Sequence, residues 1–119
     1  MSWTNEELSH ALARYEQLCR SNGMTDKATF SYWDYARRFL AWRVGDYRPT
    51  GATGPGPTPR RGSATVIDLT NDAKEYASDV EAAGKAQDTI DTYFRHAMFF
   101  VRWLDGRFVP GARLKGKGR

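Results

Sequence analysis

The chain has 119 residues, of which 40% are hydrophobic and 27% are charged. This length and composition are typical of one globular domain and leave little room for a second one. The sequence has no apolar run long enough to span a membrane, no secretory leader pattern at its start, and a single cysteine, Cys19. We therefore expect a cytoplasmic protein, associated with the nucleoid if prokaryotic, with no internal disulfide and no cysteine-based zinc site.

The net charge of +4 is unevenly distributed along the chain. Residues 1–29 carry a net charge of −1, residues 30–61 of +4, residues 62–91 of −5 and residues 92–119 of +6. This alternation predicts a folded particle with oppositely charged faces. A concentrated positive face favours an anionic partner.

Two amphipathic helices are predicted in the first half of the chain. Thr4 opens a capping box for the first helix, which ends near Gly23. Thr25 or Asp26 can cap the second helix, and the two helices make a first hairpin of residues 4–49. The inward positions recur at spacings of three and four residues: Leu8, Ala11, Leu12, Tyr15, Leu18 and Cys19 in the first helix, and Tyr32, Trp33, Ala36, Phe39 and Leu40 in the second.

The second half repeats this organisation after a Gly/Pro-rich flexible loop at residues 50–63. A short apolar segment at 66–69 precedes Thr70, which we expect to cap the third helix, and the fourth helix covers about 88–107. The second hairpin is thus 66–110. Its inward positions are Ala73, Tyr76, Ala77, Val80 and Ala83, then Ile90, Tyr93, Phe94, Ala97, Phe100, Val101, Leu104 and Phe108.

The two hairpins are related by a constant offset of 61 positions. Together they predict an all-α, compact four-helix domain of two repeated hairpins over residues 1–110, with a basic flexible tail at 111–119. A chance likeness between two amphipathic hairpins is the alternative to a true repeat. Identical residues occur at Tyr15/Tyr76, Gly23/Gly84, Tyr32/Tyr93, Ala36/Ala97, Phe39/Phe100, Trp42/Trp103, Gly45/Gly106 and Pro49/Pro110.

The second hairpin also carries a family-like pattern: Asp68-Leu69-Thr70 through Tyr76, then Gly84, Thr89-Ile90-Asp91-Thr92-Tyr93, and Phe99-Phe100-Val101-Arg102-Trp103-Leu104. This pattern resembles the N-terminal core-binding, SAM-like domain of tyrosine recombinases, the phage-integrase family. The first hairpin resembles the opening of the same domain through Gly23, Thr29, Tyr32, Phe39, Leu40 and Trp42. The resemblance implies a four-helix fold that grips double-stranded DNA with its second and fourth helices.

No catalytic constellation is visible in the sequence. The resemblance places the family's catalytic tyrosine, arginines, lysine and His-x-x-Arg motif in a separate domain, and His10 and His96 are not followed by that motif. We expect no enzyme activity, no cofactor and no small-molecule ligand. The carboxylates expected on the third helix are better explained as a solvated face than as a metal site: Asp68, Asp72, Glu75, Asp79 and Glu81.

Basic residues on the second and fourth helices point to double-stranded DNA as the partner, with a recombinase catalytic domain or further copies of the chain as additional partners on the DNA. At 100° per residue, Arg95 and Arg102 share one outward face, with Phe99 between them. Arginine and lysine on a helix face suit phosphates and guanine edges. The candidate DNA-binding residues are Lys27, Ser31, Arg37, Arg38, Arg43, Lys85, Thr92, Arg95, Phe99 and Arg102, with auxiliary phosphate contacts from Arg60, Arg61, Arg113, Lys115 and Lys117.

Two other functions remain open from the sequence. In the first, Trp42, Phe99 and Trp103 form an exposed patch that docks another protein, and binding tolerates salt. In the second, the helical domain is architectural and only the tail at 111–119 holds nucleic acid, without sequence specificity.

Overall fold

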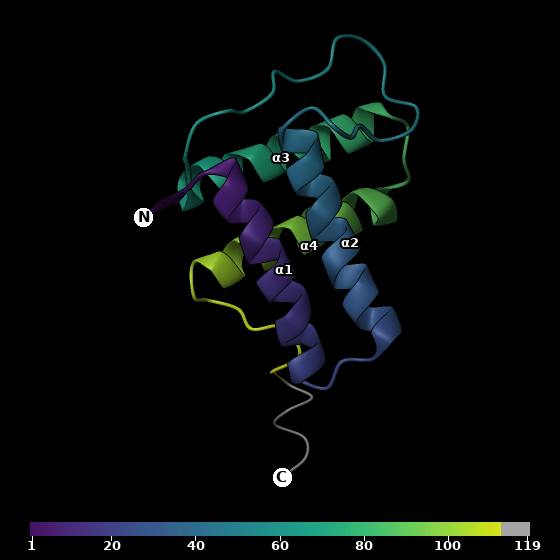
Figure 1. The fold of residues 1–119 in the computed structure, drawn as a ribbon. Coiled ribbons are helices and arrows are strands. Elements are labelled where there is room, and N and C mark those ends of the chain that lie inside the picture. The colour runs from purple at the N-terminus through teal and green to yellow at the C-terminus, as the bar shows by residue number, and fades with distance from the viewer. Residues whose placement is uncertain (113–119) are drawn as a thin grey trace.

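The structure, a computed structural model, describes residues 1–112 and has four helices arranged as two hairpins (Figure 1). The predicted all-α fold is confirmed, apart from a two-stranded sheet of minimal length that the sequence did not indicate. The elements are β1 (Ser2–Trp3), α1 (Asn5–Ser21), α2 (Asp26–Arg43), β2 (Ala64–Thr65), α3 (Val66–Ala82) and α4 (Gln87–Leu104).

The first hairpin begins and turns as its sequence predicts. The Thr4 side chain accepts a hydrogen bond from the Glu7 amide at 3.1 Å, and the Glu7 carboxylate accepts one from the Thr4 amide at 2.9 Å. This reciprocal capping box satisfies two amides that α1 leaves unpaired. Gly23 then reverses the chain with a φ of +85°, a backbone conformation that residues other than glycine rarely adopt. Thr25 caps α2.

The third helix begins five residues earlier than predicted, so the assignment of Thr70 as its cap is wrong. The N-cap is Thr65, whose side chain and that of Asp68 form a second capping box. Thr70 lies inside α3 and donates its hydroxyl to the Val66 carbonyl at 2.8 Å. The apolar segment at 66–69 is therefore the first turn of this helix and not a separate segment before it.

The repeat predicted from sequence is present in three dimensions. Shifting the bounds of α1 by 61 gives the bounds of α3, and the same shift converts α2 into α4. The contacts repeat as well. Tyr15 lies 5.1 Å from Trp103 at an interplanar angle of 50°, and the equivalent pair, Tyr76 and Trp42, lies at 5.2 Å and 50°. The tyrosine of each hairpin therefore packs against the tryptophan of the other hairpin.

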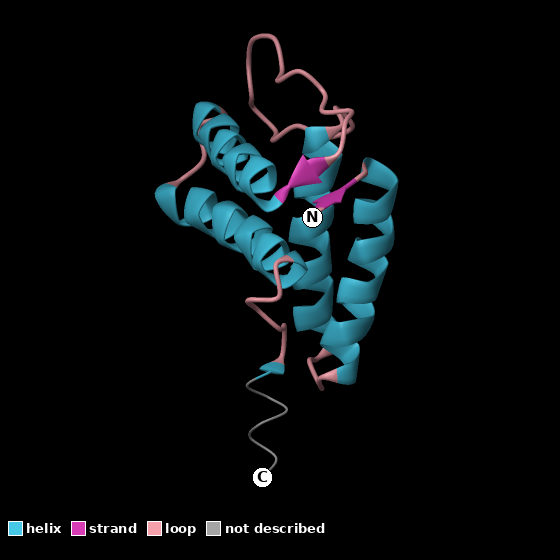
Figure 2. Cartoon of the chain, turned by 90° about the vertical axis from the view of Figure 1, so that its left-hand side faces the viewer, coloured by secondary structure: helices cyan, strands magenta, loops and turns pink. Residues whose placement is uncertain are grey.

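A pseudo-two-fold axis relates the two hairpins. Trp3 of β1 pairs with Ala64 of β2, and Ala64 is the residue equivalent to Trp3 at the offset of 61. Tyr35 stacks in the same way on its equivalent, His96, with ring centroids 4.5 Å apart. The hairpins form two layers whose helices cross steeply, with α2 and α4 in contact at the crossing (Figures 1 and 2). The core between the layers is fully buried at Tyr15, Tyr76, Phe39, Phe100, Ala36 and Ala97.

The Gly/Pro-rich segment contains no helix or strand, as predicted, and it is held at two points. The Arg60 amide donates to the Arg43 carbonyl at 2.7 Å. Arg48 donates to the carbonyls of Thr53 and Gly54 and forms an ion pair with Asp79 of α3. These contacts attach the loop to both hairpins, while its flexibility stays a prediction.

Candidate nucleic-acid interface

Stacked aromatic rings lie beneath the surface where α2 crosses α4. Beside the Tyr35–His96 stack, Tyr32 lies nearly parallel to Phe99, with ring centroids 5.7 Å apart and an interplanar angle of 7°. These two contacts place the N-terminal half of α2 beside the C-terminal half of α4. Phe99 is half-buried and also stacks on Phe108 at 4.8 Å, so it supports the surface rather than projecting from it.

Burial among these rings changes the acid–base behaviour of His96. Desolvation, with a smaller contribution from the nearby Arg95 charge, lowers the pKa of His96 to about 4. Its imidazole is neutral at physiological pH. His96 therefore adds no charge to the surface that α2 and α4 share.

Arg95 and Arg102 project from α4 as predicted. Both side chains are exposed, and neither lies within ion-pair distance of a carboxylate in the described part of the chain. Arg95 is 3.4 Å from the Thr92 hydroxyl, which itself donates to the Asp88 carbonyl at 2.8 Å. Two unpaired guanidinium groups two helical turns apart are thus available to an anion.

The arginines of α2 are in different surroundings, because they share one carboxylate. Arg37 lies 2.6 Å from Asp34, and Arg38 lies 2.9 Å from the other oxygen of the same side chain. Arg38 also donates to the Tyr93 hydroxyl at 2.9 Å. Both arginines reach the surface, but their charge is partly neutralised.

The smaller polar candidates lie on α2, on α4 and in the turn before α4. Lys27 is exposed on the first turn of α2, and its carbonyl accepts the Ser31 hydroxyl at 3.2 Å. Ser31 and Thr92 are equivalent by the offset of 61, so the two helices each present a hydroxyl at this position. Lys85 is half-exposed in the turn between α3 and α4.

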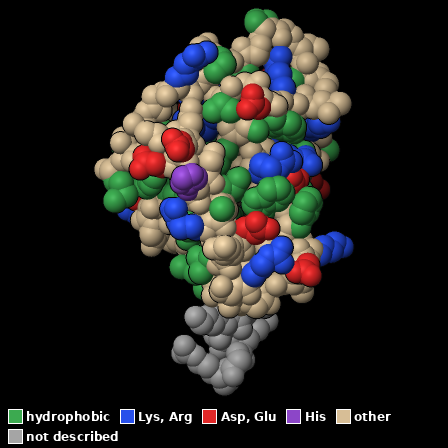
Figure 3. Space-filling view, viewed as in Figure 1, with side chains coloured by type: hydrophobic (Ala, Val, Ile, Leu, Met, Phe, Trp, Pro, Cys, Tyr) green, Lys and Arg blue, Asp and Glu red, His purple; other side chains and the backbone are tan. Residues whose placement is uncertain are grey.

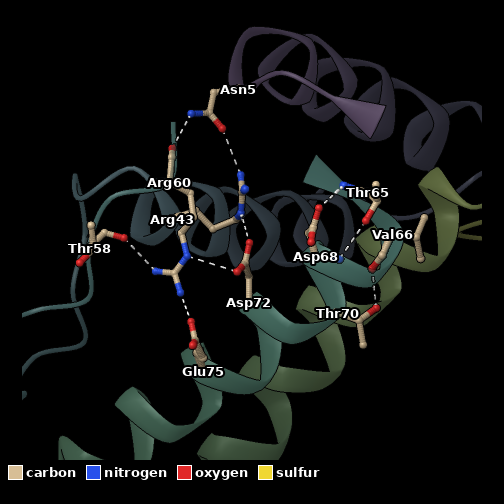
Figure 4. Close-up of polar contacts among 10 residues, drawn as sticks. All are labelled: Asn5, Arg43, Thr58, Arg60, Thr65, Val66, Asp68, Thr70, Asp72 and Glu75. Carbon is tan, nitrogen blue, oxygen red and sulfur yellow. Dashed lines mark hydrogen bonds and ion pairs between the residues drawn. The ribbon is translucent and has the colours of Figure 1, made fainter. Parts of the chain in front are cut away.

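The prediction that Arg43 contacts DNA is wrong, because Arg43 is 1% exposed. Its guanidinium donates to Asp72 of α3 at 2.8 Å and to Asn5 of α1 at 3.1 Å (Figure 4). Arg60 of the loop approaches the other oxygen of Asp72 at 3.2 Å. The four residues form an ionic network that joins α1, α2, the loop and α3.

Arg60 belongs to this network rather than to an open surface. It forms an ion pair with Glu75 (Figure 4). Its guanidinium also lies 4.8 Å from the centre of the Trp42 ring. Arg61, by contrast, is exposed. The remaining auxiliary candidates, Arg113, Lys115 and Lys117, lie outside the described residues.

The carboxylates of α3 form the predicted solvated face only in part: Asp68, Glu75 and Glu81 are exposed, whereas Asp72 and Asp79 are not. Asp72 is 9% exposed inside the network, Asp68 forms the capping box, and Asp79 accepts hydrogen bonds from Trp42 and Arg48. The hydrogen bond from Arg48 is the main cause that lowers the pKa of Asp79. Among residues 1–112, no group of histidine, cysteine, aspartate and glutamate side chains is arranged to hold a metal ion.

The aromatic docking patch proposed as an alternative is not assembled. Trp42 is 2% exposed, and Phe99 and Trp103 are half-buried against other rings. Among residues 1–112, the exposed aromatic side chain is instead that of Phe30, 57% exposed on α2, which the sequence pattern did not single out. On the face in Figure 3, hydrophobic and basic side chains adjoin over α2, with acidic groups between them.

No helix in the described part of the chain is both long enough and apolar enough to cross a membrane. Comparison of the chain with protein-family models, with curated proteins and with solved structures finds no match in any of the three. The relation to the phage-integrase family therefore stays a prediction from sequence pattern.

Proposed function

We propose that the chain binds double-stranded DNA through the surface shared by α2 and α4, as the DNA-gripping module of an integrase-type recombinase in the cytoplasm. The observation that carries this proposal is the pair Arg95 and Arg102, exposed on one face of α4 and free of any carboxylate partner within the described residues. The sequence pattern shared with core-binding domains supports the same surface. Catalysis would then belong to another domain or chain.

The proposed contacts follow from the chemistry of each group. Arg95 and Arg102 can bind phosphates or fork onto guanine edges, since the major groove admits an α-helix. Lys27 adds a point charge on the first turn of α2, and the hydroxyls of Ser31 and Thr92 suit phosphate oxygens. Arg43 has no part in this surface.

The direct test is a salt titration of binding to a mixed-sequence duplex of roughly 30 base pairs, with the matched single strand as control. We expect preference for the duplex and a log affinity that falls by several units per log unit of salt. In the variant Arg95→Ala/Arg102→Ala, removal of each arginine that binds DNA should weaken the binding free energy by about 1–3 kcal/mol.

The matched control is Arg14→Ala/Lys74→Ala, which removes the same charge from exposed positions on α1 and α3. A folded Arg95→Ala/Arg102→Ala variant that binds no more weakly than this control would refute the proposed surface. Loss of binding on deletion of residues 111–119 alone would instead support attachment through the tail.

Phe30 favours a second candidate function, docking of another protein. Its ring lies 5.8 Å from that of Trp33, and the Arg37 guanidinium lies 5.3 Å from the Trp33 ring. An exposed phenylalanine beside a half-buried tryptophan and an arginine is a composition enriched at protein interfaces. Binding of a protein partner that tolerates high salt and is abolished in Phe30→Ala would support this function.

A further inference from the structure

Positions 34 and 95 are equivalent by the offset of 61, but they carry opposite charges. On α2 the residue is Asp34, and on α4 it is Arg95. The neighbouring pair, Ser31 and Thr92, keeps its hydroxyl in both hairpins. The pseudo-two-fold surface is therefore electrostatically asymmetric, and positions 34 and 95 carry charges of opposite sign.

Asp34 is 8% exposed because two arginines of its own helix cover it. Its Oδ1 atom accepts from Nε of Arg37 at 3.1 Å and from Nη2 at 2.6 Å. Its Oδ2 atom lies 2.9 Å from Nε of Arg38. The Tyr93 hydroxyl accepts a hydrogen bond from another nitrogen of Arg38, and the Arg38 guanidinium lies 5.9 Å from the Tyr47 ring centre. Both arginines are held in place by neighbouring groups.

An anion that approaches α2 meets a carboxylate between the two guanidinium groups, so three charged side chains present a net charge of +1. The pair Arg95 and Arg102 on α4 presents +2 with no carboxylate at ion-pair distance among the described residues. Of the acidic residues of α4, Asp88 lies in the first turn, and Asp91 lies one turn before Arg95, where its carboxylate accepts a hydrogen bond from Gln87 at 2.8 Å and forms no ion pair with a described arginine. Because attraction of phosphate depends on net local charge, the α4 side is favoured.

We infer that Asp34 determines where an anion binds on this surface, by neutralising Arg37 and Arg38 and so restricting strong binding to the α4 side. This inference rests on the proposed function for its natural ligand, which is duplex DNA. It identifies Asp34 as a positioning residue that weakens binding as a whole. The DNA would then lie off the pseudo-two-fold axis, over Arg95 and Arg102.

The test compares Asp34→Asn with Asp34→Glu. Asparagine keeps the size and one acceptor oxygen but removes the charge and replaces the other oxygen with a donor group, whereas glutamate keeps the charge and both acceptors. We expect Asp34→Asn to elute from a heparin column at higher salt than the wild-type chain. On the duplex, its log affinity should depend on log salt more steeply by about 0.9, with binding about threefold tighter at low salt. Asp34→Glu should behave as wild type in both measurements.

The heparin column separates failure of this inference from failure of the DNA proposal. If no form of the chain binds duplex, DNA is not the ligand, and later elution of Asp34→Asn still supports the role of Asp34. Elution of Asp34→Asn from heparin at the same salt concentration as the wild type, or at a lower one, overturns the inference about Asp34. If circular dichroism shows that Asp34→Asn is unfolded, Arg37→Gln and Arg102→Gln decide instead. Arg102→Gln should then reduce the eluting salt more, and equal reductions overturn the inference.

Discussion

Arg43 and Arg102 lie near the ends of α2 and α4, the two equivalent helices, but their surroundings are opposite. Arg43 is buried and bound to Asp72 and Asn5, whereas Arg102 is exposed and has no carboxylate partner among the described residues. The difference arises from what faces each helix end, since α3 brings Asp72 to Arg43. Arg43 therefore stabilises the fold, whereas the guanidinium of Arg102 stays at the surface.

The largest expected effect on the free energy of unfolding comes from removing the buried arginine, Arg43. Arg43→Ala leaves Asp72 buried with Arg60 as its remaining ionic partner, and we expect a loss of about 3 kcal/mol in the free energy of unfolding. Arg102→Ala should change that free energy by less than about 0.5 kcal/mol, because its side chain is exposed. Urea unfolding followed by circular dichroism measures both. Equal effects would contradict the assignment of separate roles.

Lowering the pH should have a smaller effect, because protonation of His96 at the helix crossing should reduce the free energy of unfolding by about 1–2 kcal/mol. The effect is limited because the ring is only half-buried. Its pKa is lowered by burial from 6.5 to about 4, so the unfolded chain binds a proton more readily between these values. The stability that depends on neutral His96 should be complete above about pH 6.5 and should fall as the pH decreases toward 4.

Thermal unfolding across this pH range tests the prediction. His96→Gln should remove the pH dependence of stability between 6.5 and 4, whereas His10→Gln, at an exposed position on α1, should retain it. The same decrease in both variants would show that another group is responsible.

The smallest effect comes from the unequal helix starts. Thr25 caps α2 with its side chain, whereas its equivalent, Ala86, begins α4 in the same extended conformation without a side-chain hydrogen bond. Ala86→Ser should therefore raise the free energy of unfolding by about 0.5–1 kcal/mol. Thr25→Ala should lower it by a similar amount. An Ala86→Ser variant no more stable than wild type would show that α4 gains nothing from a cap.

Much of the fold could be predicted because its signals are local. The capping box at Thr4, the glycine turns and the aromatic spacing fix the helices, and the offset of 61 fixes their correspondence. The same offset, applied to Thr4, leads to Thr65 and would have corrected the start of α3. Hydrophobic residues in the first turn concealed this signal.

The surface was harder to predict because burial of a charged group depends on contacts between distant segments. Arg43 lies seven residues after the buried Ala36, so helical spacing alone places it on an inward face. That it could remain charged there depends on Asp72, 29 positions later in the chain. Arg95 and Arg102 were correctly placed because an outward face needs no knowledge of a partner.

The pairing of Trp3 with its own equivalent, Ala64, has a consequence for how the chain could be divided. The exposed loop around Gly54 joins two fragments of comparable length, each containing one complete hairpin. Each fragment contributes a tyrosine and a tryptophan to the contact with the other, and the second retains Arg60 for the network with Arg43. Proteolytic cleavage at Gly54 should therefore yield a non-covalent complex of two hairpins, and the separately produced fragments should complement each other.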